Sequence, residues 1–526
     1  MKKILTFFLS LSFAASLLAQ TSDDAISLAQ QFREGTARTM AMGNAFTALG
    51  GDLGAVGINP ASSGVMAYSQ VAFTPTLTTV RSSTSYLGNT LDARNTGFNL
   101  SNIGTVLTFD TGRYRGLVNY SFGFVYNKVN NYRSVMKAAG TTDNSSMLSS
   151  IAAGLEGIPW TYIDLEKTSN PYTSSNAPWP GILAWNTYVL APLSYLGGKY
   201  ANVDDSYMAS TENYDAVRDE LVIGGPLDQY FNRKTRGSNQ EFAFNFGMNF
   251  SDFVYVGANL NLYTISQITE EYYEEKAQNP AMFEDGFVSM DNSYWLRTSG
   301  AGANLKLGVI VTPVAGLRLG ATLTTPTWYS LTDEWDYTMN TAFNNGNKYT
   351  EYSPNGSWDY SLSTPMRWSV GAAYTFWDRG LISVDYEMVN YASTRLHAVR
   401  NYGNDNLYAA ENSDIATMYK NAGILRVGAE VRITDFLSLR GGYQHHASAV
   451  KGYDYHYAAW APTRIYSAGI GFNISPMFSI DLAWQHQAAH SNQFQLYDNY
   501  SGYVSVPQGI TTNSQNKAVC TLAFKF

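Results

Sequence analysis

The sequence predicts an all-β protein: a 14-stranded antiparallel transmembrane β-barrel with an N-terminal hatch inside its lumen and long extracellular loops. The chain opens with an export signal and has no later run of the roughly 18 apolar residues that a membrane-spanning helix needs. Segments of about ten residues alternate between apolar and polar side chains, as in barrel strands that face lipid on one side. Aromatic residues make up 14% of the chain and charged residues only 14%, which is typical of barrels with aromatic girdles at the two bilayer interfaces.

The first residues, MKKILTFFLSLSFAASLLAQ, predict a secretory signal peptide. Lys2 and Lys3 precede an apolar run and then small residues, and we expect cleavage near Ala19. The expected organisation is a signal peptide over residues 1–19, an N-terminal periplasmic segment and lumen hatch over 20–68, and the barrel over 69–526.

Residues 38–63, RTMAMGNAFTALGGDLGAVGINPASS, are too rich in glycine to form a stable free helix. Their apolar side chains need a partner surface, and we expect it to be the inner wall of the barrel. Asp52 is placed to cap a turn that begins at Leu53. Asn59, held extended by Pro60, is expected to reach a backbone group of the wall. Whether this hatch moves or merely fills the lumen stays open.

Strand alternation is clearest over residues 425–433, where five apolar side chains share one face and Arg426, Glu430 and Arg432 lie on the other. Six short turns rich in Gly, Pro, Asp or Ser follow such strands, at 110–112, 251–252, 313–316, 377–380, 434–435 and 475–476. Seven longer polar stretches lie between them, at about 81–96, 129–238, 269–297, 329–357, 398–421, 450–462 and 491–514. Six turns and seven loops join fourteen strands.

The longest loop, residues 129–238, is expected to fold as a cap over the barrel mouth, since a loop of this length is functional or disordered and its aromatic content argues against disorder. Helix-like pieces are expected at 144–155 and 213–222. The candidate residues for collecting a hydrophobic ligand are Trp160, Trp179, Trp185, Tyr188 and Leu190, although such side chains equally suit the core of the cap.

Charged residues of both signs fall on the predicted lumen face, with Arg426, Glu430, Arg432 and Arg440 as the leading candidates. Unpaired charges in a water-poor interior are costly, so we expect ion pairs among them and with Arg38 or Asp52 of the hatch. The alternative is that one of the arginines attracts a ligand carboxylate.

Other classes of function find little support in the sequence. A net charge of −8 argues against nucleic acid as a partner. The histidine spacings do not suit a metal on strands, and no arrangement of nucleophile and base predicts a catalytic site, so we expect no enzyme, cofactor or metal. The single cysteine, Cys520, is interpreted as a small apolar residue of the last strand.

The pattern Arg38-Thr39-Met40-Ala41-Met42-Gly43-Asn44-Ala45-Phe46, followed by Asp52 and Asn59-Pro60-Ala61, resembles the N-terminus of the FadL/TodX family of outer-membrane transporters. The resemblance implies passive uptake of hydrophobic compounds, such as long-chain fatty acids, through a barrel whose lumen is plugged by a hatch. It makes Gly43, Asp52, Asn59, Pro60 and Ala61 the candidate gating residues. It also implies lateral exit at a kinked third strand.

Gly123 is the candidate exit, because a glycine inside a strand often marks a bulge or kink. An ordinary lumen-facing glycine that makes room for the hatch is the alternative.

Two further functions stay open: a barrel subunit of a larger outer-membrane assembly or secretion complex, and a porin-like channel. The expected partners are hydrophobic small molecules or lipids, outer-membrane lipid, the barrel-assembly machinery and other outer-membrane proteins. The C-terminal Phe526 ends an alternating strand and resembles the signal read by that machinery.

Overall fold

The computed structural model describes residues 21–377, 379–399, 406–452, 461–500 and 504–526. The expected signal peptide therefore lies outside the described residues. Within them, no helix combines the length and the apolar character needed to cross a bilayer.

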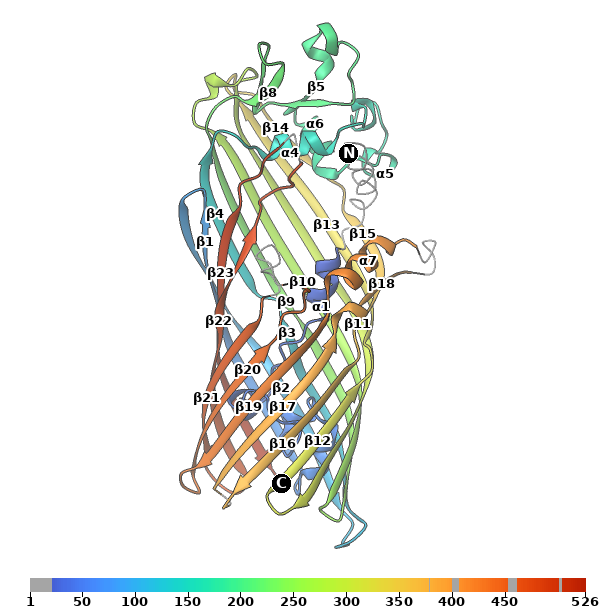
Figure 1. Ribbon diagram of the computed structural model, residues 1–526, viewed down its shortest axis with the longest axis vertical. Helices are drawn as coiled ribbons and strands as arrows, with labels where there is room; N and C mark the ends of the chain where they lie inside the picture. The colour runs from blue at the N-terminus through green and yellow to red at the C-terminus, as the bar shows by residue number, and fades with distance from the viewer. Residues whose placement is uncertain (1–20, 378, 400–405, 453–460, 501–503) are drawn as a thin grey trace.

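The wall is a closed antiparallel barrel with fourteen strand positions, which confirms the predicted fold (Figure 1). Four positions are each occupied by two successive strands, and pairing of the last strand with the first closes the cylinder. The wall strands are β1 (Gln70–Tyr86), β2 (Asn89–Asp110), β3 (Leu117–Asn131) with β4 (Ser134–Thr142), β9 (Leu227–Phe250), β10 (Val254–Ala277), β11 (Phe287–Val314), β12 (Leu317–Thr324) with β13 (Trp328–Phe343), β15 (Gly356–Ser363) with β16 (Arg367–Phe376), β17 (Gly380–Asn390) with β18 (Arg395–Ala398), β19 (Asn421–Arg432), β20 (Leu437–His446), β21 (Thr463–Asn473), β22 (Phe478–Phe494) and β23 (Gly509–Lys525).

The six predicted short turns all connect consecutive wall strands at one end of the barrel, the lower end in Figure 1. The predicted loops at 81–96, 269–297 and 329–357 are wrong in extent, because most of their residues continue the strands. β1 and β2 meet at a two-residue turn, and β9, β10 and β11 run for 24, 24 and 28 residues. A tilted strand crosses a bilayer in about ten residues, so this side of the wall rises far above the membrane.

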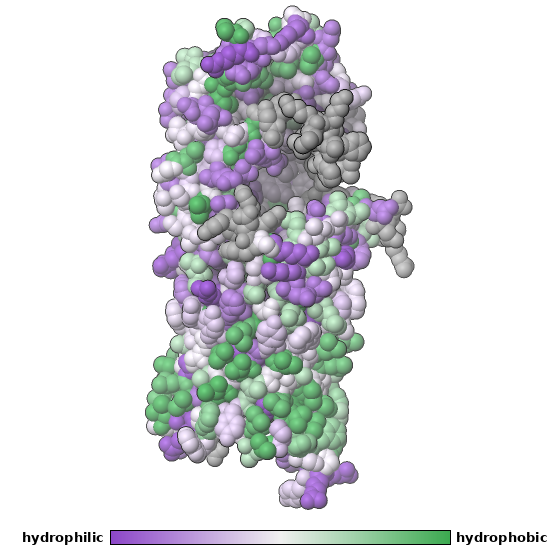
Figure 2. All heavy atoms as spheres, in the orientation of Figure 1, coloured by the Kyte–Doolittle hydropathy of each residue, from purple (hydrophilic) through white to green (hydrophobic). Residues whose placement is uncertain are grey.

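The membrane-embedded part of the wall lies toward the lower end of the barrel, where Figure 2 shows apolar side chains gathered. The alternation predicted for 425–433 is present: Leu425, Val431 and Ile433 are exposed on the outer face, and Arg426 is buried on the inner face. Above this band, polar residues also occupy the outer face of the wall (Figure 2), while apolar side chains such as Tyr273, Met290 and Met339 are buried on the inner face. The apolar outer face that marks a membrane strand is lost there, which explains why the sequence indicated loops.

Residues 143–226, between β4 and β9, form a folded cap at the upper end. The cap contains α4 (Met147–Gly154), α5 (Pro171–Ser174), α6 (Trp179–Asn186) and the strand pairs β5 (Leu190–Pro192) with β6 (Tyr207–Ala209) and β7 (Glu212–Asp215) with β8 (Glu220–Ile223). The helix expected at 144–155 is confirmed, whereas the one expected at 213–222 is wrong and forms the β7–β8 hairpin. Residues 129–142 and 227–238 of the expected loop belong to wall strands.

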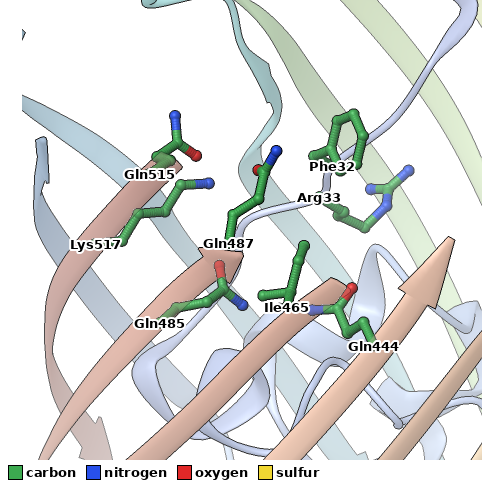
Figure 3. A pocket seen from close by; sticks show the side chains of 8 residues that line it. All are labelled: Phe32, Arg33, Gln444, Ile465, Gln485, Gln487, Gln515 and Lys517. Atoms are coloured by element: carbon green, nitrogen blue, oxygen red, sulfur yellow. The ribbon is translucent and has the colours of Figure 1, made fainter. Parts of the chain in front are cut away.

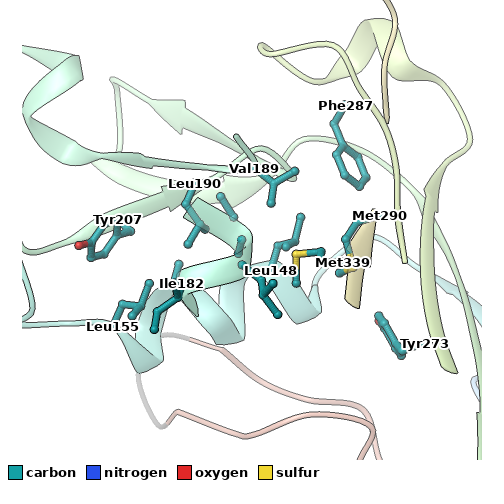
Figure 4. Packing of buried hydrophobic residues seen from close by; sticks show 14 of the residues in the cluster. Leu148, Leu155, Ile182, Val189, Leu190, Tyr207, Tyr273, Phe287, Met290 and Met339 are labelled. Carbon is teal, nitrogen blue, oxygen red and sulfur yellow. The ribbon is translucent and has the colours of Figure 1, made fainter. Parts of the chain in front are cut away.

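The cap is attached to the wall by a buried apolar core (Figure 4). Leu148 of α4 and Ile182 of α6 pack with Phe287 and Met290 of β11 and Met339 of β13. The hairpin strand β14 (Lys348–Tyr352) extends the wall beside it, paired with β13.

The N-terminal segment occupies the lumen below the cap, as predicted for a hatch. It contains α1 (Ser22–Ala29), α2 (Ala37–Ala41), α3 (Leu53–Val56) and the 3-10 helix η2 (Pro60–Val65). Residues 37–64 are almost entirely buried, and α1 lies higher in the barrel, beside α7 (Ala409–Met418). The apolar side chains of this segment have therefore found the inner wall as their partner surface.

Candidate functional site

The hatch is anchored by the two polar residues singled out in the sequence. The Asp52 carboxylate accepts hydrogen bonds from the Gly54 amide at 2.9 Å and the Thr36 hydroxyl at 2.6 Å, so it caps α3 as expected. The Asn59 amide donates to the carbonyl oxygens of Thr47 at 2.6 Å and of Val309 on β11 at 3.2 Å. The prediction that Asn59 reaches a backbone group of the wall is confirmed.

Glycine brings the hatch and the wall into backbone contact. Gly43 has φ of +60°, and a Cβ atom there would lie 2.9 Å from the backbone nitrogen of Tyr443. On the wall, a Cβ atom on Gly442 would lie 2.2 Å from the backbone nitrogen of Gly43. Around η2, Ala61 is fully buried and the Pro60 carbonyl accepts from the Asn245 side chain of β9 at 3.0 Å.

Three of the four candidate lumen charges form ion pairs, which confirms the expected pairing. Glu430 binds Arg38 of the hatch at 2.8 Å and Arg440 at 2.5 Å, and Arg440 continues to Asp481 at 2.5 Å. Asp52 does not join this network and bonds within the hatch.

Arg426 pairs with Glu387 at 2.7 Å. Arg432 differs from the prediction: it is exposed near the β19–β20 turn, because it lies at the end of its strand and below the lumen network.

A small cavity of about 30 Å³ separates the hatch from the wall beside Arg426. Arg33 of the segment and Lys306, Arg367 and Arg426 of the wall line it, together with Glu387. Arg367 and Arg426 both bind Glu387, at 2.9 and 2.7 Å. Arg33 is itself paired with Glu241 at 2.6 Å, so the cations around this cavity are largely balanced by buried carboxylates, although Arg367 and Arg426 share one of them.

A second small cavity lies beside Phe32 and Arg33 and is lined by neutral amides of the wall, with Lys517 at its edge (Figure 3). The amides belong to Gln444 of β20, Gln485 and Gln487 of β22 and Gln515 of β23. Its volume is about 10 Å³, room for about one water molecule. These two cavities are thus too small to hold a hydrophobic compound in the conformation described.

Glu34, which sequence reasoning missed, contacts three strands at once. Its carboxylate accepts from Ser101 of β2 at 2.5 Å and pairs with Lys517 of β23 at 2.8 Å, and its backbone amide donates to the Lys128 carbonyl of β3 at 2.8 Å. Burial opposes ionisation, but the ammonium groups of Lys517 and Lys128 outweigh it and lower the pKa of Glu34. The residue precedes the conspicuous glycine-rich pattern, and only its buried partners reveal its role.

The Glu34 contacts mark the point where β2 and β3 part. Backbone pairing of the two strands ends at Asn102 and Asn127, and β3 has a register shift against β9 between Lys128 and Asn130. Above Asn102, within the described chain, β2 pairs only with β1. Above Asn102 and Asn127, the boundary between β2 and the chain of β3 and β4 is called the β2–β3 seam. It is bridged by side chains, such as Arg133 donating to Asn95 at 2.7 Å.

The bulge predicted at Gly123 is wrong. Gly123 pairs with Val106 on one side and Asn245 on the other without a register shift. It faces the lumen between the exposed Phe122 and Phe124, and the third strand becomes irregular five residues later instead. A glycine tolerates a bulge but does not require one.

The candidate ligand-collecting residues contribute largely to the cap itself. Leu190 is buried, and Trp160 stacks on Trp185 at 5.4 Å. Trp179 packs against Trp335 of β13 at 5.4 Å, where cap and wall meet. Tyr188 alone of the five is well exposed, at 62%.

Among the described residues, no group of three or more His, Cys, Asp or Glu side chains is arranged to hold a metal ion. Cys520 is half-buried on β23 and is a free thiol.

Comparison with known proteins agrees with this architecture. Residues 238–526, more than half of the chain, match the family model described as "Outer membrane protein transport protein (OMPP1/FadL/TodX)". A search of curated protein sequences found no match.

Among solved structures, the chain is similar to a Pseudomonas aeruginosa FadL homologue, with 13% identity, 94% of this chain and 98% of that chain covered, and a TM-score of 0.53. It is also similar to the Ralstonia pickettii toluene transporter TbuX, with 16% identity, coverage of 94% and 99%, and a TM-score of 0.48. The P. putida toluene transporter TodX shows 13% identity, coverage of 89% and 92%, and a TM-score of 0.47.

The first of these likenesses supports the barrel fold, and the family model covers the wall strands from the middle of β9 to the C-terminus. The chain belongs to the OMPP1/FadL/TodX family of outer-membrane transport proteins.

Proposed function

We propose that this protein takes up hydrophobic compounds, such as long-chain fatty acids, passively across the outer membrane and releases them sideways between β2 and β3. The proposal rests on the contacts that Glu34 makes. A residue of the segment that fills the lumen binds β2, β3 and β23 at the point where the wall loses its backbone pairing. Movement of this segment would open the lumen and the seam together.

The membership of a transport-protein family supports this function, as does the filled lumen. A steady water-filled pore, as in a porin, needs a continuous aqueous path, whereas the two cavities described beside the hatch have volumes of only about 10 and 30 Å³, room for a few water molecules at most. In the proposed cycle, Gly43, Asp52, Asn59, Pro60 and Ala61 hold the hatch in its closed position.

Capture begins at the cap, where Tyr188 is exposed beside Tyr349 and Trp179 meets Trp335. Trp160, Trp185 and Leu190 support this aromatic surface from within the cap. A ligand with a carboxylate would then be attracted to the arginine-rich cavity beside Arg367 and Arg426.

Locking the β2–β3 seam tests the proposal. Cysteines replace Asn95 and Arg133, whose side chains meet across the seam, in a Cys520→Ala background, and a short bifunctional thiol reagent joins them. Uptake of radiolabelled palmitate is measured in cells that lack their own transporter, before and after cross-linking.

The control is Ser83→Cys with Asp92→Cys, which are register partners on β1 and β2, where the strands are already paired. We expect cross-linking across the seam to abolish uptake and the control cross-link to leave it unchanged. Equal uptake with the seam locked and unlocked would refute lateral exit at this place.

A further inference from the structure

We propose that β1 and β2 form a site on the outside of the wall that binds a phosphorylated glycolipid of the outer leaflet, the chemical class of lipid A. The site, called here the β1–β2 lipid site, consists of three register pairs: Arg81 with Arg94, Thr79 with Thr96 and Leu77 with Phe98. The inference goes beyond the proposed uptake and does not depend on it, because the site lies on the outer face of the barrel and not in the lumen.

The side chains of the three pairs point away from the lumen. Those of β1 alternate with buried residues, and those of β2 are all exposed. Leu77 is 46% exposed and Phe98 73%. Register partners on one face lie about 5 Å apart, and successive pairs along the strands about 7 Å apart. Since β1 and β2 meet at their cap-side end, the apolar pair lies lowest, the threonines follow and the arginines lie nearest the cap.

The order of these layers matches the order of groups in a phosphorylated glycolipid. The apolar pair lies at the upper part of the apolar band, where acyl chains end. Above it, the Thr79 and Thr96 hydroxyls lie 3.0 Å apart, at the level of the ester and sugar oxygens of a glycolipid. The Arg94 guanidinium donates to the Thr96 hydroxyl at 3.3 Å, which directs the cation toward that level. The phosphate of the lipid would then lie between the two guanidinium groups.

The arginine pair has no counter-charge within the protein. Arg81 and Arg94 are directly opposite each other, and like charges in this position of a sheet repel. In the part of the chain that the structure describes, neither of them forms an ion pair with a carboxylate. Asp92 is exposed two residues further along β2, opposite Ser83, and it pairs with neither arginine. An anion from outside the protein would relieve this repulsion.

Other partly exposed arginines of the wall do have a carboxylate partner. Arg236 of β9 pairs with Glu270 of β10 at 2.8 Å, and Arg297 of β11 pairs with Glu334 of β13 at 3.6 Å. The β1–β2 pair departs from this pattern. Two adjacent guanidinium groups can donate to one phosphate from two sides, in the bidentate geometry that arginine offers to phosphate oxygens.

The apolar layer favours a lipid over free phosphate as the occupant. Exposed arginines in water bind a free anion weakly, because solvent and salt screen the attraction. A lipid is already held beside Leu77 and Phe98 by its acyl chains, so its phosphate is presented to the arginines at high local concentration. A phosphate on a sugar also carries more negative charge than the diester of a zwitterionic phospholipid, which favours the glycolipid.

The test measures lipid binding to the mature protein by native mass spectrometry from detergent. The probes are lipid A with two phosphates and the same lipid without phosphate, in EDTA so that no divalent cation bridges a phosphate to Asp92. We expect Arg81→Gln with Arg94→Gln to weaken binding of the phosphorylated lipid about tenfold or more. Binding of the lipid without phosphate should not change.

The matched control is Arg236→Gln with Arg297→Gln, which removes the same charge from arginines that have carboxylate partners. This variant should bind the phosphorylated lipid as the unmodified protein does. Equal weakening in both double variants would assign the effect to the overall charge of the protein and overturn the site. Unchanged binding in the Arg81→Gln, Arg94→Gln variant would overturn it as well.

Thermal unfolding provides a second readout. Phosphorylated lipid A should raise the unfolding temperature of the unmodified protein but not that of the Arg81→Gln, Arg94→Gln variant. Replacing both arginines by lysine should retain part of the rise, because the charge remains and the bidentate geometry is lost. Inorganic phosphate alone should have no effect; an equal rise with inorganic phosphate would identify a free-phosphate site and contradict the lipid assignment.

Discussion

Single residues decide how firmly the N-terminal segment is held. Glu34 is fully buried in contact with Ser101, Lys517 and the backbone of Lys128, so its charge is balanced only in the docked position. Removing one partner of a buried pair costs about 3–5 kcal/mol, because the other charge is left without compensation.

We therefore expect Glu34→Gln to loosen the segment, measured as faster proteolytic cleavage within residues 30–66 of the purified barrel. Glutamine keeps an acceptor for Ser101 but leaves the Lys517 ammonium unpaired. Glu166→Gln, in the cap and with an exposed side chain, is the matched control. Cleavage rates equal to those of the unmodified protein would show that Glu34 does not hold the N-terminal segment in place.

The stabilising contribution of the Glu34 contacts has a predictable pH dependence. The pKa of Glu34 is lowered in the folded state, so its contribution is complete above the ordinary value of 4.5 and is lost as the pH falls through the lower folded value. Proteolysis by an acid-active protease should accelerate in that range for the unmodified protein and change less for Glu34→Gln. A parallel acceleration in both proteins would assign the effect to other groups.

At the scale of elements, matched glycines set the hatch against the wall. Gly442 on β20 faces Gly43, and the neighbouring Gly441 has no atom within 4 Å of the place a Cβ atom would take. Adjacent positions of one strand thus differ only in the face on which they lie.

We expect Gly442→Val to displace the hatch, since overpacking costs about 1–3 kcal/mol, while the barrel still assembles. Gly441→Val, which points toward lipid, should have no such effect. Hatch displacement is measured by hydrogen exchange of residues 37–64, and equal protection in both variants would contradict the close packing.

Some elements of the structure could be predicted from the sequence and others could not. Turns at 251–252 and 475–476 and the membrane strands were predictable, because period-two alternation and turn residues are local signals. The roles of Asp52 and Asn59 followed from capping chemistry, which is local as well.

The position of the seam was not predictable from Gly123. It depends on which strands pair above the membrane and on Glu34 reaching Ser101 and Lys517, residues far apart in the chain. Likewise, Arg432 occupies a lumen-facing position in the alternating pattern, but it is the last residue of β19 and lies outside the charge network.

For the whole molecule, the structure combines a wall that rises far above the bilayer, a cap packed onto that wall and a lumen filled by the N-terminal segment. In the proposed function, these parts form a route from the exposed aromatic surface of the cap, through the lumen, to the seam between β2 and β3. The proposed route ends near the apolar band, where Phe98 of β2 and Phe122 and Phe124 of β3 are exposed.

Lateral exit is tested most directly by where the ligand first arrives. The protein is inserted in one orientation into vesicles that carry a quencher on their lipid chains, and a fluorescent long-chain acid is added on the cap side. A control reports arrival in the enclosed water through an encapsulated binding protein. If the ligand leaves sideways, quenching within the bilayer should come first and should disappear when Asn95→Cys and Arg133→Cys are cross-linked; arrival in the enclosed water without prior quenching, and unaffected by the cross-link, would contradict lateral exit.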